Sequence, residues 1–455
     1  KIMSDFLFSE FEAISSAAWK QKIQVDLKGE DYNDTLLWKT NEGITVKPFY
    51  TKEDTTYQKP TAAEEGFRIC QTIHITNEKE ENLLLLDALK RGATAIQFIA
   101  KRKFDPAVLL KGADLTALKV YFKFNFLDAA FTAEIEKFSK AKHCYFQIDI
   151  LGSLAEVGNW FVSLKEDYRH LEKIVSSTDN SIAVSADLYQ NAGANMVQQL
   201  AYSLAHANEY LNHFGAENAH KIHFQFSVAG HYFHEIAKLR AFRLLWEALL
   251  KEYGIENIEA HIFVQPATRN KTIYDYNVNM LRTTSECMSA ILGGADTISN
   301  IPYNHIYAEK NEFGERISRN QLLILQQESG FQEAQNFAEG SYYIASLSTQ
   351  MAEKALTIFK QIEQGGGFLK QLKEGSIQRK IKESARKEDT QFRHKELVLL
   401  GANLYPNKEN FMHGNLTLDP FVKQRNIKTL LPPIIRKRLS ENLEKQRLQQ
   451  EISPL

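Results

Sequence analysis

The sequence has little of what marks secreted or disulfide-stabilised proteins. Only three cysteines occur among 455 residues, at Cys70, Cys144 and Cys287. They are widely separated and form no C-x-x-C pair, which excludes a disulfide framework. Cys70 and Cys144 fall within apolar strand patterns, so we expect buried, reduced thiols.

Excess charge and long apolar runs are also missing. The formal net charge is −1, which gives no electrostatic basis for binding nucleic acid or a membrane surface. The longest apolar run, residues 83–86, is followed by Asp87 and is far too short to cross a bilayer. Residues 1–20 have neither the basic start nor the small-residue cleavage site of a signal peptide. We therefore expect a cytoplasmic protein without a nucleic-acid or membrane partner.

Short β-rich runs alternate with longer helical runs through the middle of the chain. Strands are predicted at residues 68–75, 94–100, 118–124, 143–150, 181–186, 221–228, 260–265 and 295–301. Helical patterns between them cover residues 79–91, 128–140, 191–213, 231–253 and 275–292. Because helix-length segments join successive strands, the pattern predicts parallel strands and an α/β fold, specifically a (β/α)₈ TIM barrel. A doubly wound open sheet is the alternative, but no G-x-G-x-x-G motif follows the first strand.

The remaining segments divide the chain into four predicted parts. Residues 1–66 form an N-terminal helix and extended arm, and residues 67–330 form the barrel. Residues 331–405 are predicted to be a helical extension of the barrel domain, with helical patterns at residues 344–363 and 368–388 and Gly365–Gly367 as a linker between them. Residues 406–455 form a proline-containing tail that ends in a charged helix.

The predicted strands alternate between an apolar face and a polar face. Since the apolar face must meet the outer helices, the polar face is predicted to line the barrel lumen. These polar residues are Lys123, Gln147, Asp149, His223 and Gln225, with His74 and Gln97 as further candidates. Ordinary barrel lumens are filled by aliphatic residues. The polar set is either a passage for a long polar ligand or a self-satisfied plug, and the length of the side chains favours the plug.

Three local motifs could carry chemistry, and each has a simpler structural interpretation. The order His231-x-x-His234-Glu235 differs from the H-E-x-x-H zinc motif, so we interpret it as a polar helix start and predict no metal site. Asp187 precedes a helical run and is more typical of an N-cap than of a general base. Glu286 and Arg282 are four residues apart, which predicts a surface ion pair.

Six segments together resemble the coenzyme-B12-dependent acyl-CoA mutases, methylmalonyl-CoA mutase in particular. They are DLKG and TNEGITVKPFYT in the arm, EIAKLRAFRLLW (235–246), RTTSECMSAILGGADTI (282–298), RISRNQLLILQQESG (316–330) and EGSYYIASLSTQMAEKA (339–355). The resemblance spans most of residues 20–405. It implies a (β/α)₈ barrel, in which the CoA tail of the substrate threads along the barrel axis past small side chains.

The sequence differs from this family at the family's catalytic, substrate-binding and cofactor-binding positions. Leu188, in SADLYQNAGA, stands at the position of the family's catalytic histidine, and an isobutyl group cannot move a proton. Gln265 is retained, but residues 266–270 differ from the family's loop, so Gln265 and Glu286 are at most vestigial cofactor-binding residues. Residues 50–66 replace the family's substrate loop. The D-x-H-x-x-G signature of a flavodoxin-like cobalamin domain does not occur, and we expect that domain to be absent.

The resemblance implies a non-catalytic small subunit of a heterodimeric mutase. Adenosylcobalamin would be held by the partner large subunit, with no cofactor and no catalytic residue in this chain, which alone is expected to be inactive. A homodimer of the isolated chain is possible. Two alternatives are a split mutase whose cobalamin domain is a separate protein, and a stand-alone barrel that binds acyl-CoA or another metabolite in a polar lumen.

Overall fold

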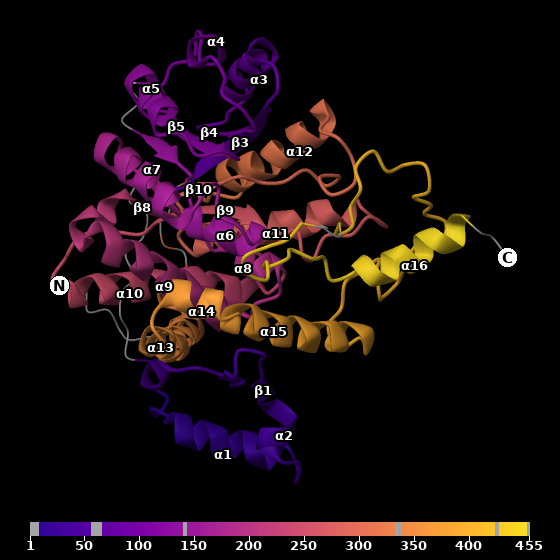
Figure 1. Ribbon diagram of the computed structural model, residues 1–455. Coiled ribbons are helices and arrows are strands. Elements are labelled where there is room, and N and C mark those ends of the chain that lie inside the picture. Colours follow the sequence, from indigo (N-terminus) through magenta and orange to yellow (C-terminus); the bar gives the residue numbers. More distant parts are fainter. Residues whose placement is uncertain are drawn as a thin grey trace, which may run out of the picture.

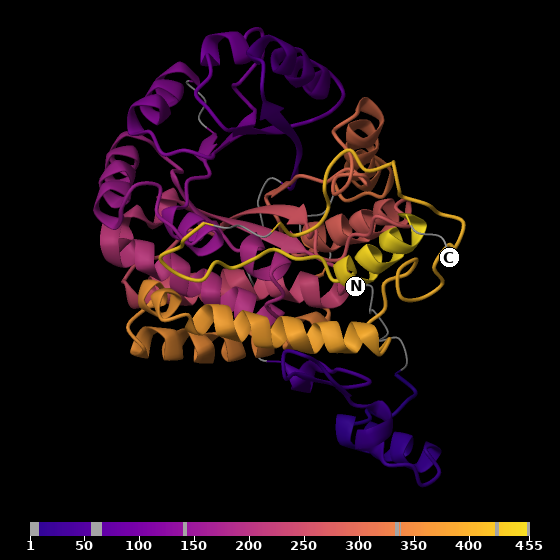
Figure 2. The same ribbon diagram turned by 45° about the vertical axis from the view of Figure 1, so that its right-hand side comes forward.

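Eight parallel strands form a barrel in the computed structural model, which describes residues 9–55, 66–139, 143–332, 336, 338–423 and 427–452. The strands follow the order β6-β5-β4-β3-β10-β9-β8-β7 around the sheet. They are β3 (Arg68–Ile75), β4 (Ala95–Ala100), β5 (Lys119–Phe124), β6 (Cys144–Phe146), β7 (Ile182–Ser185), β8 (Ile222–Val228), β9 (His261–Pro266) and β10 (Thr297–Ile298). Helices surround them (Figures 1 and 2), so the predicted TIM barrel is confirmed.

Helices connect the strands on the outside of the barrel. They are α3 (Glu78–Lys90), α4 (Pro106–Leu109), α5 (Ala129–Ser139), α6 (Ile150–Val157), α7 (Leu164–Ser177), α8 (Asp187–Asn191), α9 (Met196–Phe214), α10 (Tyr232–Glu252), α11 (Val278–Leu292) and α12 (Glu312–Leu323). Their apolar faces pack on the outward faces of the strands in one continuous core. The three cysteines are buried within the protein as free thiols, and burial raises their pKa values.

A second helical layer covers α9 and α10. It consists of α13 (Tyr342–Gln364), α14 (Phe368–Lys373) and α15 (Ser376–Arg393), which lie below the barrel in Figure 1. The helices α9 and α10 are therefore buried on nearly all sides, as their many buried residues show. This agrees with sequences that are apolar on more than one helical face.

Glycines shorten two of the predicted helices. The helical pattern 191–213 divides at Gly193, whose φ of +97° ends α8, and α9 begins only after the capping residue Asn195. The pattern 368–388 is interrupted at Gly375, with φ of +73°, and becomes α14 and α15. The left-handed backbone conformation at each glycine cannot continue an α-helix.

The N-terminal arm contains α1 (Ser16–Asp26), α2 (Tyr32–Leu36) and a short hairpin of β1 (Trp38–Lys39) and β2 (Thr45–Val46). The hairpin docks on the barrel, where the Trp38 ring stacks on His231 with ring centres 5.3 Å apart. In contrast, α1 buries none of its residues and projects away from the body (Figures 1 and 2). Part of the loop that replaces the family's substrate loop, residues 56–65, lies outside the described residues.

Residues 427–440, here called the strap, cross the carboxyl-end face of the barrel before α16 (Glu441–Ile452). The backbone N–H groups of Ile434, Lys437 and Leu439 donate to the carbonyls of Ala155, Asn191 and Arg269, at 2.7, 3.0 and 2.8 Å. The tail is therefore fixed to the loops that follow β6, β7 and β9. No helix in the described part of the chain is long and apolar enough to cross a membrane.

The barrel closes between β6 and β7. The Phe146 amide donates to the Asn180 carbonyl and the Ala183 amide to the Ile148 carbonyl, both at 2.9 Å. One residue further, the Asp149 carboxylate continues the seam, since the Ser185 amide donates to its Oδ2 at 2.8 Å. A side chain thus performs the role of a backbone carbonyl where β6 has ended.

Asp149 corrects a prediction, because its carboxylate does not belong to the polar layer of the lumen. It caps α6 through the Gly152 amide at 2.7 Å and bonds His206 and Tyr210 of α9, at 2.9 and 2.7 Å. The strand pattern failed here because Asp149 is the N-cap residue of α6, so its carboxylate turns towards that helix and α9. Burial opposes ionisation, but His206 and these hydrogen bonds outweigh it and lower the pKa of Asp149 to about 2.

Replacing Asp149 with asparagine is expected to lower the free energy of unfolding by about 2 kcal/mol at neutral pH, because the ionised carboxylate is favoured in the folded state. A depressed pKa contributes stability above the unfolded-state value near 4, and that stability is lost as the pH falls towards about 2. The free energies of unfolding of Asp149→Asn and wild type, measured with urea, should therefore become equal in acid. Asp26→Asn, at an exposed position, is the control. Equal stability of Asp149→Asn and wild type at pH 7 would contradict this role.

Candidate functional site at the carboxyl-end mouth of the barrel

A cavity of about 710 Å³ opens where the barrel strands end. Side chains from most of the βα loops and from the strap line it, among them Thr72, His74, Lys123, Gln147, Asp187, Gln265, His305, Lys310 and Arg436. Active sites of TIM barrels lie at this face. The cavity, here called the mouth, is therefore the candidate functional site.

Aromatic side chains close the bore beneath the mouth. The Tyr121 hydroxyl on β5 lies 2.8 Å from Nε2 of His261 on β9 and 2.7 Å from the Thr297 hydroxyl on β10. Because β5 and β9 lie on opposite sides of the eight-stranded barrel, this contact crosses its full width. The Tyr145 ring stacks on both, with ring centres 4.9 Å from Tyr121 and 4.2 Å from His261. A layer packed in this way leaves no passage for a ligand.

A polar layer lies between the aromatic layer and the mouth. The Thr72 hydroxyl donates to Oε1 of Gln97 at 2.8 Å, and Gln97 Nε2 donates to Oε1 of Gln147 at 2.6 Å. The Ser299 hydroxyl lies 2.8 Å from that of Thr72, and Gln265 Nε2 reaches Gln97 at 3.5 Å. These hydrogen bonds link side chains in or just beyond five strands across the lumen, as in a plug rather than a channel, although the buried Nε2 of Gln147 has no hydrogen-bond partner.

The other predicted lumen residues occupy different depths. His223 and Gln225 of β8 are buried, and the His223 ring packs edge-on against Tyr145. Burial together with the neighbouring His261 lowers the pKa of His223 to about 3, so its imidazole is neutral at physiological pH. Lys123 is only partly buried and lines the mouth. His74 also lines the mouth and remains accessible from it.

Leu188 lies in α8, at the corner that follows β7, and is completely buried in the hydrophobic core. Its side chain is therefore part of the packing between the barrel and its helices. It offers neither a proton nor a hydrogen bond to the mouth. This corner presents Asp187 to the mouth instead.

Asp187 is held by an arginine that sequence analysis did not identify. It is not the N-cap of α8, since Ala186 occupies that position. The strap residue Arg436 donates from Nη1 to Oδ2 of Asp187 and from Nε to Oε1 of Glu156, both at 2.7 Å. Burial opposes the charge on Asp187, but Arg436 and Lys123 hold its pKa below the ordinary value. No local motif marks this contact, because 249 residues separate the two partners.

Glu286 differs from its predicted role as a surface residue. It is 1% exposed and accepts hydrogen bonds from Lys271 and Asn270, at 2.8 and 2.7 Å. Arg282 donates instead to Oδ1 of Asn279 and to the Leu400 carbonyl. Glu286 therefore fixes the loop that follows β9 from within, although the spacing alone had assigned this helix face to solvent. Gln265, in contrast, reaches the mouth.

His231 and His234 lie at the start of α10 beside the N-terminal hairpin. Both rings pack against Trp38, with ring centres 5.3 Å from it. The described part of the chain contains no group of three or more histidine, cysteine, aspartate or glutamate residues that could hold a metal ion. Glu235 is buried in an ion pair with Lys238, which anchors α10 to the corner after β7 through Gln190.

The fold and the mouth define a (β/α)₈-barrel protein whose axial bore is closed by its own side chains. Residues 105–451 match the family model described as methylmalonyl-CoA mutase. The chain is 32% identical to the methylmalonyl-CoA mutase small subunit of Porphyromonas gingivalis, over 90% of this chain and 73% of that protein. The chain therefore belongs to the methylmalonyl-CoA mutase family.

Other relatives are longer than the matched region. Methylmalonyl-CoA mutase of Cereibacter sphaeroides is 28% identical over 85% of this chain, and the human mitochondrial enzyme is 25% identical over 90%. The match covers 64% of each of these two proteins, which is less than two thirds of their length. Among solved structures, dihydropteroate synthase of Yersinia pestis aligns over 58% of this chain and 93% of its own, with 12% identity and a TM-score of 0.32, too low to support an argument.

Replacing Arg436 with methionine is expected to loosen the strap, because Asp187 and Glu156 lose their shared partner while Asp187 stays largely buried. Removing one member of a largely buried pair costs about 1–3 kcal/mol. We expect a lower midpoint in urea unfolding and faster proteolytic cleavage within residues 427–440. Lys423→Met, at a side chain that is 74% exposed, is the control. Unchanged proteolysis of Arg436→Met would show that the ion pair does not hold the strap.

Proposed function

We propose that this chain is the small, non-catalytic subunit of an adenosylcobalamin-dependent methylmalonyl-CoA mutase, the enzyme that interconverts (R)-methylmalonyl-CoA and succinyl-CoA. In this proposal a catalytic large subunit holds the cofactor and performs the rearrangement in the cytoplasm. The present chain stabilises that subunit. The observation that carries the proposal is the closed bore beneath a corner in which Leu188 stands at the family's histidine position.

The bore supports a structural role, because an extended acyl-CoA tail cannot pass a contact such as that between Tyr121 and His261. The corner supports it too, since proton transfer requires a titratable group and Leu188 has none. The relative of P. gingivalis that matches over 90% of this chain is itself named as a small subunit.

The residues present do not fit adenosylcobalamin well. A corrin ring needs a broad open face, whereas the strap crosses the carboxyl-end face of this barrel and inserts Arg436 into the mouth. Glu286, one of two candidate cofactor-binding residues, already has its carboxylate bonded to Lys271 and Asn270. We therefore assign no chemical step to this chain.

The N-terminal arm is the best candidate for contact with the large subunit. Its side chains Ile14, Trp19 and Val25 are 71%, 49% and 72% exposed, although they are large and apolar. Exposed apolar groups that gather on a projecting segment are typical of an interaction surface. Burying them against a partner would stabilise the complex by about 25 cal/mol for each Å² of apolar surface removed from water.

Trp19→Asp combined with Val25→Asp is expected to weaken assembly with the cognate large subunit by at least about tenfold, because charges on the arm oppose burial. Native mass measurement of mixtures of the two purified chains gives the dissociation constant. Leu83→Asp, at a position on α3 that is 67% exposed, is the control and should leave assembly unchanged. A wild-type chain that forms no complex with the large subunit would contradict the proposed function.

The isolated chain is expected to give no calorimetric signal with adenosylcobalamin or with succinyl-CoA at micromolar concentrations. The closed bore excludes the second ligand, and the strap crosses the face that a corrin ring would occupy while Glu286 is already paired. Isothermal titration of the purified wild-type chain measures both. Saturable binding of succinyl-CoA would favour the alternative of a metabolite-binding barrel.

A further inference from the structure

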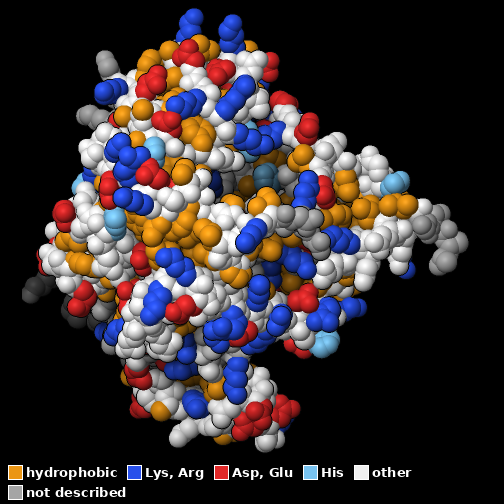
Figure 3. Space-filling model, viewed as in Figure 1, with side chains coloured by type: hydrophobic (Ala, Val, Ile, Leu, Met, Phe, Trp, Pro, Cys, Tyr) orange, Lys and Arg blue, Asp and Glu red, His pale blue; other side chains and the backbone are white. Residues whose placement is uncertain are grey.

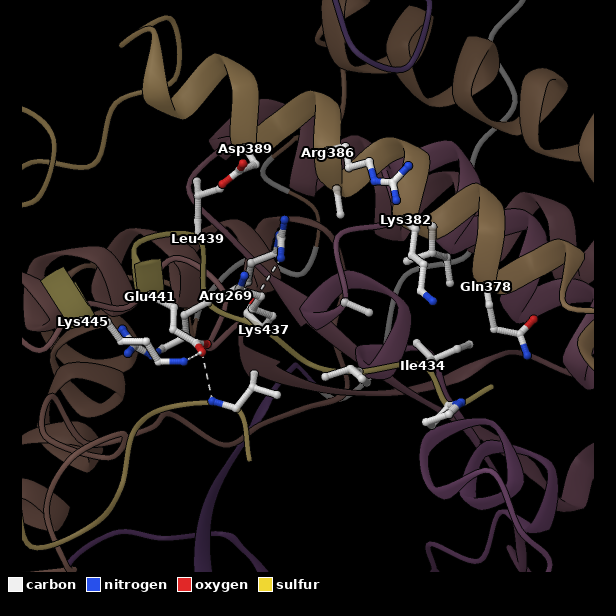
Figure 4. A pocket seen from close by; sticks show the side chains of 17 residues that line it. Arg269, Gln378, Lys382, Arg386, Asp389, Ile434, Lys437, Leu439, Glu441 and Lys445 are labelled. Carbon is white, nitrogen blue, oxygen red and sulfur yellow. Dashed lines mark hydrogen bonds and ion pairs between the residues drawn. The ribbon is translucent and has the colours of Figure 1, made fainter. Parts of the chain in front are cut away.

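A second surface, away from the arm, has the properties of a docking groove. It lies between α15 and residues 433–445, has a volume of about 560 Å³, and is shown in Figure 4. Lys382 and Gln378 project from α15 towards the strap on one side, and Ile434, Lys437 and Leu439 line the other. The groove is distinct from the mouth, because the two cavities share no lining residue.

The floor of the groove is apolar. Ile381 and Ala385 lie one turn apart on α15 and face Ile434 and Leu439 of the strap. Ile435 also lines the groove and is 52% exposed. Such a floor offers van der Waals contact to an apolar side chain, but few polar groups that could orient a small ligand.

The rim of the groove carries uncompensated positive charge. Lys382 and Arg386 are one helical turn apart on α15, and Lys437 lies opposite on the strap. No ion-pair partner for these three cations occurs among the described residues. Figure 3 shows Lys and Arg side chains gathered over the strap and α15.

The acidic residues of the groove already have cationic partners. Asp389 pairs with Arg393 at 3.2 Å, and Glu441 pairs with Lys445 at 2.8 Å. The two other arginines of the groove are also neutralised, Arg269 by Glu388 and Arg438 by Glu444. Lys382, Arg386 and Lys437 therefore give the groove its net positive charge.

We propose that this groove docks an acidic amphipathic helix of a partner protein. Carboxylates one turn apart on such a helix would match Lys382 and Arg386, and apolar residues on its adjacent face would fill the floor beside Ile381. The inference rests on the proposed function in one respect, since it takes the partner to be the large subunit. It adds a contact surface that the arm does not provide.

The test uses charge reversal on one face of α15. Lys382→Glu with Arg386→Glu changes the rim, whereas Arg379→Glu with Lys387→Glu makes the same charge change at exposed positions of the same helix that do not line the groove. The probe is a labelled synthetic helix with leucine on one face and glutamate on the adjoining face. Its scrambled isomer, which has the same composition, is the peptide control.

Fluorescence anisotropy with the full chain is expected to show saturable binding of the amphipathic helix. The affinity should fall at least about tenfold in the rim variant and change less than about twofold in the matched control. The scrambled isomer should bind more weakly than the intact helix. Equal binding by both variants, absence of binding by the wild type, or preferential binding of vesicles that contain anionic phospholipid would each overturn the inference.

Assembly with the large subunit separates this inference from the proposed function. The rim variant is expected to form the complex at least about tenfold more weakly than the matched control. If wild type and both variants assemble equally well, the groove inference fails while the proposed function stands. If the wild type does not assemble at all, the proposed function fails, and with it the assignment of the large subunit as the groove's partner.

Discussion

The contact of the Tyr121 hydroxyl with His261 and Thr297 is the constraint on which the rest depends. It joins strands on opposite sides of the barrel and brings the Tyr145 ring into a stack that fills the bore. An interior packed to this density cannot also be a channel. The scaffold of a mutase barrel is therefore retained in a form that excludes the ligand path implied by the family resemblance.

Carboxylates at the carboxyl-end face serve structure in this chain. Asp149 completes the seam between β6 and β7, and Asp187 holds the strap through Arg436. In both cases burial disfavours the charge and a nearby cation or hydrogen-bond donor restores it. Groups that a catalytic barrel would direct at a substrate are thus committed to internal partners.

Much of the fold could be predicted from the sequence, because regular alternation is a local property. The strand at β3 was predicted with its observed bounds, Arg68–Ile75, and all eight strands were predicted in the observed order along the chain, whereas α4, α6 and α7 were not among the predicted helices. The prediction failed where tertiary contacts place a side chain differently from its local sequence pattern. Asp149 follows the period-two pattern but caps α6, and Glu286 follows a surface spacing although it is buried and bonded to Lys271.

The mouth was less predictable than the barrel, because its contacts join residues that are far apart in the sequence. Gln147, Gln225 and His223 could be placed in the interior from alternation alone, but Arg436 approaches Asp187 from a segment that has no pattern of its own. Only the folded chain brings such residues together. The groove between α15 and the strap likewise combines two segments whose proximity no periodicity indicates.

If this chain is the small subunit that we propose, a barrel with a closed bore contributes no substrate site to the two-subunit complex. Equilibrium dialysis of the purified two-subunit complex against a radiolabelled, non-reactive acyl-CoA analogue measures the number of sites directly. The account predicts one saturable site for each pair of subunits, located on the large subunit. Two sites of comparable affinity for each pair would contradict it.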